Sequence, residues 1–358
     1  DLAAARAWWA AGYTGAGVDV AVVDSGVARV GALAEPGRVL DGGDFRRGDP
    51  GAAHDGDPPG GGYGDGYGHG TFMAGLIAGR DPLGLAMAPD ARIVAVPVGD
   101  EEGDADRAEV AAAIRWAAAH GREHGLNVRV LNLSYAAPPL PLGAPDPLLE
   151  AVEEAHRAGI LVVAAVGNTG EAGPGLASPA LSRAALAVGA TRTAGGPSPL
   201  DDERAEFSAR GAGCVGCRTP DLLAPGAHLR SWRAPGAVVD RRHPEGRDRD
   251  PRLFRGSGTS QAAAVTSGAA ALVLSRWPHL SPDEVKAYLL AHAQPLPDLD
   301  ATAQGAGALL LPPPHDDGGA VWSGARWSGT RWSGTRWSGT RWSGTRWSGT
   351  RWSGTRWS

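Results

Sequence analysis

Three polar residues at separate turns of the chain have the side chains of a nucleophilic hydrolase. Asp24 directly follows residues 18–23, a nearly continuous apolar run, where the carboxyl end of a buried strand is expected. His69 lies in a Gly-His-Gly-Thr sequence, and Ser260 ends a Gly-Thr-Ser sequence that leads into an alanine-rich stretch. A hydroxyl, an imidazole and a carboxylate are together the groups of a nucleophile, its general base and the residue that orients the base.

The surroundings of these side chains favour such roles. His69 suits the base because imidazole titrates near neutral pH, and the flanking glycines leave its ring uncrowded. Ser260 is expected at a helix N-terminus, where backbone N–H groups and the helix dipole stabilise a developing oxyanion. Asn168 follows the apolar residues 160–166 in a Gly-Asn-Thr-Gly turn, from which its amide could donate to the same oxyanion.

Each motif alone also has an ordinary structural explanation. Asp-Ser-Gly and Asn-Thr-Gly are common turn sequences. A glycine/serine loop before a helix could instead bind phosphate, but the lysine of the Walker pattern is missing after Gly258. The catalytic interpretation therefore depends on the four motifs taken together.

The elements that must position these side chains alternate along the chain. Five nearly continuous apolar runs predict strands that are buried on both faces. They are residues 18–23, 92–98, 128–134, 160–166 and 185–190. The helical pattern covers residues 105–120, 147–158 and 258–276, and a Ser-Pro-Asp-Glu capping sequence opens another helix at Ser281. This alternation predicts an α/β fold, a parallel sheet sandwiched between helices, in one catalytic domain over residues 1–311.

The last part of the chain has a different composition. Residues 312–320 begin with three prolines and predict a linker, and residues 321–358 repeat Trp-Ser-Gly-Thr-Arg. A five-residue repeat would not place its Trp side chains on one face of a strand or a helix, so the tail is predicted to be disordered. The alternative is an anchor, in which Arg contacts an anionic surface such as a cell wall and Trp stacks on sugars.

Charge and hydropathy exclude some classes of protein. The formal net charge is −5, and the seven tail arginines leave about −12 on the preceding residues. An acidic body with a basic tail argues against a nucleic-acid-binding core. No run of 18 apolar residues predicts a transmembrane segment, and no signal peptide is visible.

The two cysteines, Cys214 and Cys217, form a Cys-x-x-Cys pair. A structural zinc site needs about four ligands, and the sequence has no second pair. A local disulfide is the favoured hypothesis, and a reduced inert pair and a redox or metal function are the alternatives.

The motifs together resemble the active-site signatures of the subtilase family, whose triad has the order Asp-His-Ser. The similarity extends over about residues 10–308, and residues 220–226 resemble the segment that precedes the serine in that family. The resemblance implies a serine-type endopeptidase that hydrolyses proteins through an acyl-enzyme. Family members are usually exported, so a secreted protein is expected. The tail resembles the Trp-Ser-Gly repeats of some actinobacterial secreted subtilases.

The resemblance also assigns roles in the active site. Ser260 would attack the peptide carbonyl, His69 would carry the proton, and Asp24 would orient His69. Asn168 and the backbone N–H of Ser260 would form the oxyanion hole. Protein or peptide substrates are the expected partners.

Substrate-binding residues follow from the same resemblance. Backbone at Gly99, Leu133, Ser134 and Tyr135 would pair with an extended substrate as an added strand. The acidic loop of residues 100–106 is expected to be solvated, and the alternative is that it attracts basic substrate residues.

Several positions depart from the family pattern or adjoin its primary pocket. Ala136, which with Gly167 is expected to adjoin the substrate, stands where the family often has Gly. Its methyl group predicts a preference for small or medium side chains at the cleaved position. Phe72 replaces a second His, and Ala264 replaces a Pro; neither belongs to the triad.

No cofactor is required for this chemistry. Acids between Asp41 and Asp65 could bind structural calcium, as in some family members, although no EF-hand spacing is present. A zinc hydrolase is disfavoured because no Glu directly follows His120, which lies four residues before His124.

Two other hydrolase classes fit the sequence less well. A serine-carboxyl peptidase would need Glu and Asp where this chain has His69 and Asn168, and a serine esterase would need a Gly-x-Ser-x-Gly sequence around Ser260. The remaining alternative is a surface-anchored binding protein that acts through its repeat tail, with a weakly active or inactive peptidase body.

Overall fold

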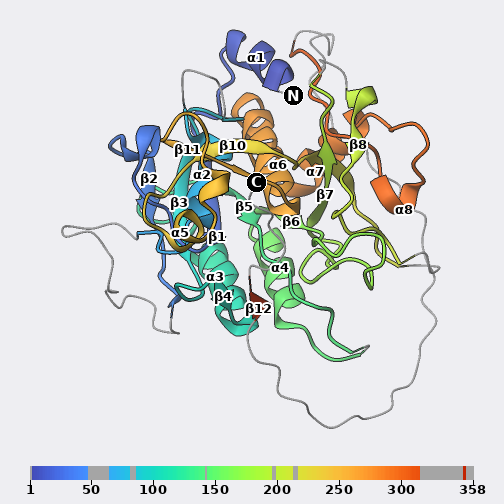
Figure 1. Ribbon diagram of the computed structural model, residues 1–358, viewed down its shortest axis with the longest axis horizontal. Coiled ribbons are helices and arrows are strands. Elements are labelled where there is room, and N and C mark those ends of the chain that lie inside the picture. The colour runs from blue at the N-terminus through green and yellow to red at the C-terminus, as the bar shows by residue number, and fades with distance from the viewer. Residues whose placement is uncertain are drawn as a thin grey trace.

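A mostly parallel β-sheet lies between two layers of helices (Figure 1). The computed structural model describes residues 2–46, 64–80, 86–141, 143–195, 199–212, 217–314 and 350–351. The strand order is β2-β3-β1-β5-β6-β7-β8, with β9 also paired to β7, and among these pairs only β7 and β8 are antiparallel. The strands are β1 (Asp19–Asp24), β2 (Val39–Asp41), β3 (Arg92–Pro97), β5 (Val128–Leu133), β6 (Leu161–Ala165), β7 (Leu186–Arg192), β8 (Glu203–Arg204) and β9 (Leu222–Pro225).

The central strand β1 explains why the sheet is covered on both sides. All six of its residues are buried. Val20 and Val22 belong to one hydrophobic cluster, and Ala21 and Val23 belong to the other, because successive side chains point to opposite faces. The continuous apolar runs in the sequence therefore correspond to a two-sided core, and the predicted α/β sandwich is confirmed.

Each face of the sheet has its own helices. Helices α3 (Arg107–His120) and α4 (Pro147–Arg157) contribute to the cluster that holds Ala21. On the other face lie α1 (Leu2–Ala10), α2 (His69–Ala78), α6 (Thr259–Arg276) and α7 (Pro282–His292). No described helix is long and apolar enough to span a bilayer.

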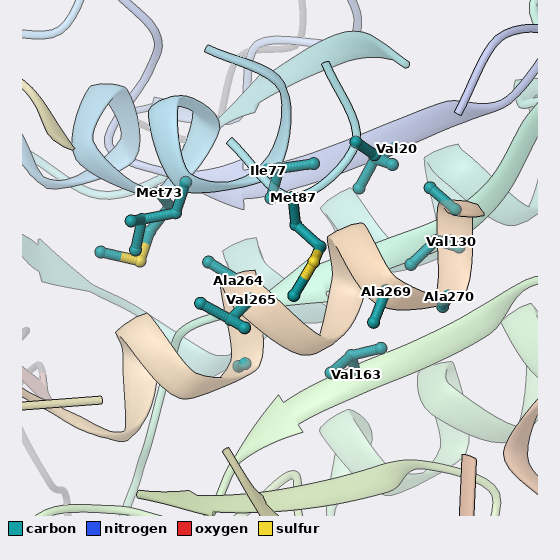
Figure 2. Close-up of a cluster of buried hydrophobic side chains, with 14 of the residues drawn as sticks. Val20, Met73, Ile77, Met87, Val130, Val163, Ala264, Val265, Ala269 and Ala270 are labelled. Carbon is teal, nitrogen blue, oxygen red and sulfur yellow. The ribbon is translucent and has the colours of Figure 1, made fainter. Parts of the chain in front are cut away.

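Helix α6 runs through the middle of this second layer, with every residue from its start to Leu274 buried. Its Ala269 and Ala270 lie beside the strand residues Val130 and Val163 (Figure 2). At Gly268 a Cβ atom would lie 2.5 Å from the Cβ of Met87. Small residues on several sides thus allow α6 to approach its neighbours closely.

Local sequence signals fix the helix starts. Ser281 and Glu284 form the predicted capping box of α7, and Asp106 with Glu109 forms another at α3. Such caps contribute about 1 kcal/mol each. The remaining described elements are short: β4 (Asp104–Ala105), β10 (Leu229–Trp232), β11 (Leu253–Gly256), β12 (Thr350–Arg351), α5 (Val238–Arg242), α8 (Ala301–Gln304), η1 (Gly31–Ala34), η3 (Pro199–Asp201) and η4 (Pro244–Gly246).

The first residue of the predicted linker is attached to the body. The indole Nε1 of Trp8 donates to the carbonyl of Pro312 at 2.8 Å. Of the predicted repeat tail, only the β12 backbone is described, and it pairs antiparallel with β4. The rest of the linker beyond Pro314 and the other tail residues lie outside the described residues.

Candidate active site

The carboxylate of Asp24 and the imidazole of His69 form a buried hydrogen-bonded pair. Nδ1 of His69 lies 2.8 and 2.9 Å from the two carboxylate oxygens of Asp24, and both side chains are fully buried. Asp24 ends β1, and His69 begins α2 after Gly68, whose φ of 104° favours glycine. Because the carboxylate accepts from Nδ1–H, the neutral ring leaves Nε2 unprotonated and able to act as a base.

Ser260, in the first turn of α6, contacts the chain at the end of β5, the strand next to β1. Val23 of β1 pairs with Leu133 of β5, and the carbonyl of Ser134, the next residue, accepts a hydrogen bond of 3.2 Å from Ser260 Oγ. The hydroxyl of Ser134 in turn donates to the carbonyl of Ser260 at 3.2 Å. Neighbouring strands are about 4.8 Å apart, so the sheet brings the serine close to the Asp24–His69 pair.

A network of side-chain hydrogen bonds supports the end of β5 next to Ser134. Nδ2 of Asn132 donates to the hydroxyl of Ser134 at 2.9 Å, and the hydroxyl of Ser267 donates to Oδ1 of Asn132 at 3.1 Å. All three side chains are buried. The network connects β5 to α6 and holds the strand and the serine helix in register.

The side chain of Asn168 is oriented by the residue before the serine. Its Oδ1 accepts from the backbone N of Thr259 at 2.8 Å and from the Thr259 hydroxyl at 3.0 Å. A backbone N–H can only donate, so this contact fixes which amide atom is oxygen. The planar amide therefore directs Nδ2 away from Thr259, where it can donate to another acceptor.

The carboxyl ends of adjacent strands explain why these residues meet. Strands β1, β5 and β6 are neighbours in the sheet, and they lead into Asp24, Ser134 and Asn168 respectively. In open α/β sheets, binding sites form at this edge. The site therefore combines a buried carboxylate–imidazole pair, a hydroxyl at a helix start and an oriented amide.

The predicted substrate-binding residues lie around the same edge. Leu133 ends β5, and Ser134 and Tyr135 follow it as buried residues. The Tyr135 hydroxyl donates to the carbonyl of Ala105 at 3.3 Å, so its side chain points toward β4. Gly99 has φ 76°, and a Cβ there would lie 2.7 Å from the carbonyl oxygen of Asp104.

Ala136 lies next to Gly167, the residue before Asn168. A Cβ built on Gly167 would lie 4.0 Å from the Cβ of Ala136 and 3.2 Å from the Cβ of Ala177. The methyl group of Ala136 thus limits the room beside the loop that carries Asn168.

The loop before His69 contains a carboxylate to which the sequence assigned no catalytic part. Oδ1 of the buried Asp65 accepts from the hydroxyl of Ser25 at 2.9 Å and from the N of Gly68 at 2.6 Å. Its Oδ2 accepts from the N of Thr71 at 2.8 Å and from the Thr71 hydroxyl at 2.6 Å. Burial raises the pKa of Asp65 above its usual value, although these hydrogen bonds oppose the shift.

Ser25 joins this carboxylate to the Asp24–His69 pair. Its backbone N donates to Oδ1 of Asp24 at 2.8 Å, and its hydroxyl accepts from the N of Gly70 at 3.0 Å. Asp65 therefore holds the turn that presents His69. Only the Asp-Gly spacing before His69 hinted at this role, and that dipeptide is common in turns.

The acids proposed for calcium binding have other partners where they are described. Asp41 pairs with Arg29 at 2.8 Å, and Asp44 pairs with Arg46 at 2.6 Å. Asp49, Asp55 and Asp57 lie outside the described residues. Within the described part of the chain, no group of three or more His, Cys, Asp or Glu residues could hold a metal.

The acidic loop after β3 is organised by its own side chains. Oδ1 of Asp100 accepts from the backbone N of Glu102 at 2.9 Å and from that of Asp104 at 3.0 Å. Glu102 also pairs with Arg242 at 2.7 Å.

The other residues that the sequence analysis singled out lie in the core, in an ion pair or in a disulfide. Phe72 and Ala264 are buried core residues of α2 and α6. His120 pairs with Glu123 at the exposed end of α3. Cys217 takes part in a disulfide, and Cys214, the other cysteine of the sequence, lies outside the described residues.

Comparison with known proteins agrees with this geometry. The model of the Subtilase family matches residues 15–308. Serine protease AprX of Bacillus subtilis (strain 168) is 33% identical over 305 residues, which are 83% of this chain and 65% of AprX. Subtilisin Savinase of Lederbergia lenta is 33% identical over 283 residues, which are 78% of this chain and 84% of the relative.

Two further comparisons concern length and fold. The chain spans 59% of the alkaline protease of Alkalihalobacillus alcalophilus, to which it is 33% identical over 283 residues, or 78% of this chain. The crystal structure of a cold adapted subtilisin-like serine proteinase superposes with a TM-score of 0.60 at 24% identity, covering 83% of this chain and 88% of that one. The fold is therefore that of a subtilisin, and from the family match and these relatives the chain belongs to the subtilase family.

Proposed function

We propose that this protein is a serine endopeptidase that hydrolyses internal peptide bonds of proteins. The observation that carries the proposal is the buried Asp24–His69 pair beside a serine at the start of a helix. Family membership supports the same conclusion. The chemistry needs only the side chains and backbone groups of the chain, and a structural calcium ion is not required for any step.

In the proposed mechanism, Ser260 Oγ attacks the carbonyl carbon of the substrate while Nε2 of His69 takes its proton. Asp24 stabilises the resulting imidazolium through the Nδ1 hydrogen bond. Nδ2 of Asn168 and the backbone N–H of Ser260 donate to the oxyanion. His69 then protonates the leaving amine, and an acyl-enzyme remains until water hydrolyses it.

The proposed substrate is an extended peptide. Backbone of Gly99 on one side and of residues 133–135 on the other would pair with it as an added strand. Ala136 lies next to Gly167, which supports a preference for small or medium side chains at the cleaved position. A peptide-library profile dominated by bulky aromatic residues would contradict this preference.

The test of the endopeptidase proposal is cleavage of an internally quenched peptide with blocked ends. Wild-type protein should cleave it, and the Ser260→Ala variant should not. Hydrolysis of simple esters without cleavage of any blocked peptide would favour an esterase instead. Binding to surfaces without any hydrolysis would favour the alternative of a binding protein with an inactive peptidase body.

The repeat tail supports a finer proposal about location. Seven Arg and eight Trp follow Gly319, and they suit an anionic, sugar-rich surface such as a cell wall. We propose that the protein is a secreted subtilase of the actinobacterial repeat-tail kind and that its tail holds it at that surface. Sedimentation with isolated cell walls tests this, because removal of residues 321–358 should abolish binding while leaving peptide hydrolysis intact. Equal sedimentation of both forms would contradict it.

A further inference from the structure

The described backbone of the repeat tail lies on a strand of the catalytic domain. β12 pairs antiparallel with β4, with Thr350 opposite Ala105 and Arg351 opposite Asp104 (Figure 1). Among the described residues, β12 is the only strand that pairs with β4. Without β12, the backbone of β4 would be an edge to which another extended chain can add.

The position of β4 brings this contact to the proposed substrate-binding residues. A Cβ on Gly99 would lie 2.7 Å from the carbonyl oxygen of Asp104, so the backbone of β4 lies directly against Gly99. On its other residue, the carbonyl of Ala105 accepts from the Tyr135 hydroxyl at 3.3 Å. β4 therefore touches both segments that would pair with an extended substrate.

Short links connect these segments to the catalytic side chains. The N of Val98, at the end of β3, donates to the carbonyl of Asp24 at 2.8 Å. Tyr135 directly follows Ser134, whose carbonyl accepts from Ser260 Oγ at 3.2 Å. A strand added to β4 thus lies where the acyl side of an extended substrate would pair.

Charge favours the tail as the occupant of this edge. The loop of residues 100–106 has five acids and no basic residue, and four of the acids are exposed. The five are Asp100, Glu101, Glu102, Asp104 and Asp106. Residues 321–358 carry seven Arg and no acid. Opposite charges of this number attract over about 8–10 Å at ordinary ionic strength, so the loop attracts the tail toward β4.

The length and the repetition of the tail make the contact possible within one chain. Between Pro314 and Thr350 lie 35 residues, which span at most about 120 Å when extended. The Thr-Arg pair that faces β4 occurs six times in the tail, so several repeats offer the same sequence. A tethered segment competes intramolecularly, and even weak pairing then fills the place for much of the time.

We propose that a repeat of the tail adds to β4 as a strand and competes with peptide substrates for the active site, an inference that rests on the proposed function. Backbone pairing holds the tail at β4, and the acidic loop attracts its positive charge. An anionic surface would draw on the same arginines, so a protein held at such a surface would have an open site.

The experiment uses the full chain and a blocked, uncharged peptide as substrate. One variant changes the seven tail arginines to glutamine, and its matched control changes them to lysine, which keeps the charge. A tail that fills the site for about nine-tenths of the time raises KM about tenfold. We therefore expect KM of the glutamine variant to be about tenfold below that of the wild type, with kcat unchanged, and the lysine variant to resemble the wild type.

A second variant tests the strand itself. It changes the threonine of each Thr-Arg pair in the tail to proline, which keeps the charge but removes a backbone donor. Its KM should fall like that of the glutamine variant. A synthetic peptide of three repeats, added to the glutamine variant, should raise KM without changing kcat.

The outcomes separate this proposal from the proposed function. A wild-type KM in either the glutamine or the proline variant would overturn the tail proposal, as would an added repeat peptide that does not compete. A tail that is cut from the wild-type chain during the assay, as seen by intact mass, would make it a substrate and would also overturn the proposal. Failure of the wild type and of all variants to cleave blocked peptides would instead refute the proposed endopeptidase activity.

Discussion

Oδ1 of Asn168 accepts two hydrogen bonds from Thr259, the residue that precedes Ser260. The loop after β6 and the start of α6 are thereby held together at the point where the proposed oxyanion hole and the nucleophile meet. The Thr259 hydroxyl also accepts from the N of Gly167 at 3.2 Å. The orientation of the Asn168 amide is thus set before any substrate binds, which is the condition for stabilising a transition state without reorganisation.

Asn168→Ala should therefore reduce kcat by about 10²–10³-fold with little change in KM, the loss that follows removal of this donor in subtilisin itself. The reason is that the amide donates to charge that develops only in the transition state. Steady-state kinetics on a blocked peptide measures the effect. Thr259→Val, which keeps the backbone donor but removes the hydroxyl, should give a smaller loss. A change confined to KM in Asn168→Ala would contradict the assignment.

Asp65→Asn should destabilise the protein by about 1–3 kcal/mol, because an NH₂ group would replace an oxygen that accepts two hydrogen bonds. The turn that carries His69 would loosen, so kcat should fall as well. Urea unfolding and peptide kinetics measure the two effects. Asp298→Asn, at an exposed position, is the control and should change neither. An Asp65→Asn variant with wild-type stability would show that the four contacts do not hold the turn.

Asp221 should make stability depend on pH. Burial alone would raise the pKa of this carboxyl, but Arg218 at 2.6 Å, Lys286 at 3.0 Å and the N of Ala187 at 2.8 Å outweigh burial and lower it. A lowered pKa in the folded state means that the stabilisation is present above the unfolded value of about 3.9 and is lost as pH falls through the folded value.

Asp221→Asn should therefore reduce the free energy of unfolding at pH 7 by about 2 kcal/mol, the contribution of hydrogen bonds to a charged group, and the difference from wild type should shrink toward pH 3. Denaturant unfolding at a series of pH values measures this. Asp283→Asn removes an exposed carboxylate that pairs with His156, and it should have little effect at any pH. A difference for Asp221→Asn that stays constant with pH would refute the ionic explanation.

Ala136→Gly should widen the space beside Gly167 and admit larger side chains at the cleaved position. One methyl group in a pocket corresponds to about tenfold in specificity. The ratio of kcat/KM for an aromatic over an alanine substrate should therefore rise by about that factor. Ala137→Gly, at the buried neighbouring residue, should change stability but not this ratio. An unchanged ratio in Ala136→Gly would place the pocket elsewhere.

The sequence allowed the long elements to be predicted because their causes are local. The apolar runs at β1 and β6 and the capping box at Ser281 need no knowledge of distant residues. The short strands β8 to β11 have only two to four residues each, which leaves no period to detect. The sequence analysis did not predict helix α1, whose nine residues have no acidic residue in the first turn and no basic residue in the last.

The features of the site also divide into residues with a local sequence signal and contacts between residues far apart in the chain. Asp24, His69, Ser260 and Asn168 could be named because each follows a recognisable strand or begins a recognisable helix. The contacts of Asp65 could not be predicted, because one of its partners, Ser25, is 40 residues away and nothing in either residue's neighbourhood specifies the bond. The orientation of Asn168 by a residue 91 positions later was hidden for the same reason.

The most direct test of the central claim is labelling with a fluorophosphonate probe, followed by mass spectrometry of the labelled peptide. Wild-type protein should carry the probe on Ser260, Ser260→Ala should not label, and Asp24→Asn should label about 10⁴-fold more slowly. Ser275→Ala on the same helix is the control and should label like wild type. Failure of folded wild-type protein to label, or equal labelling of Ser260→Ala, would contradict the assignment of this site as a serine peptidase triad.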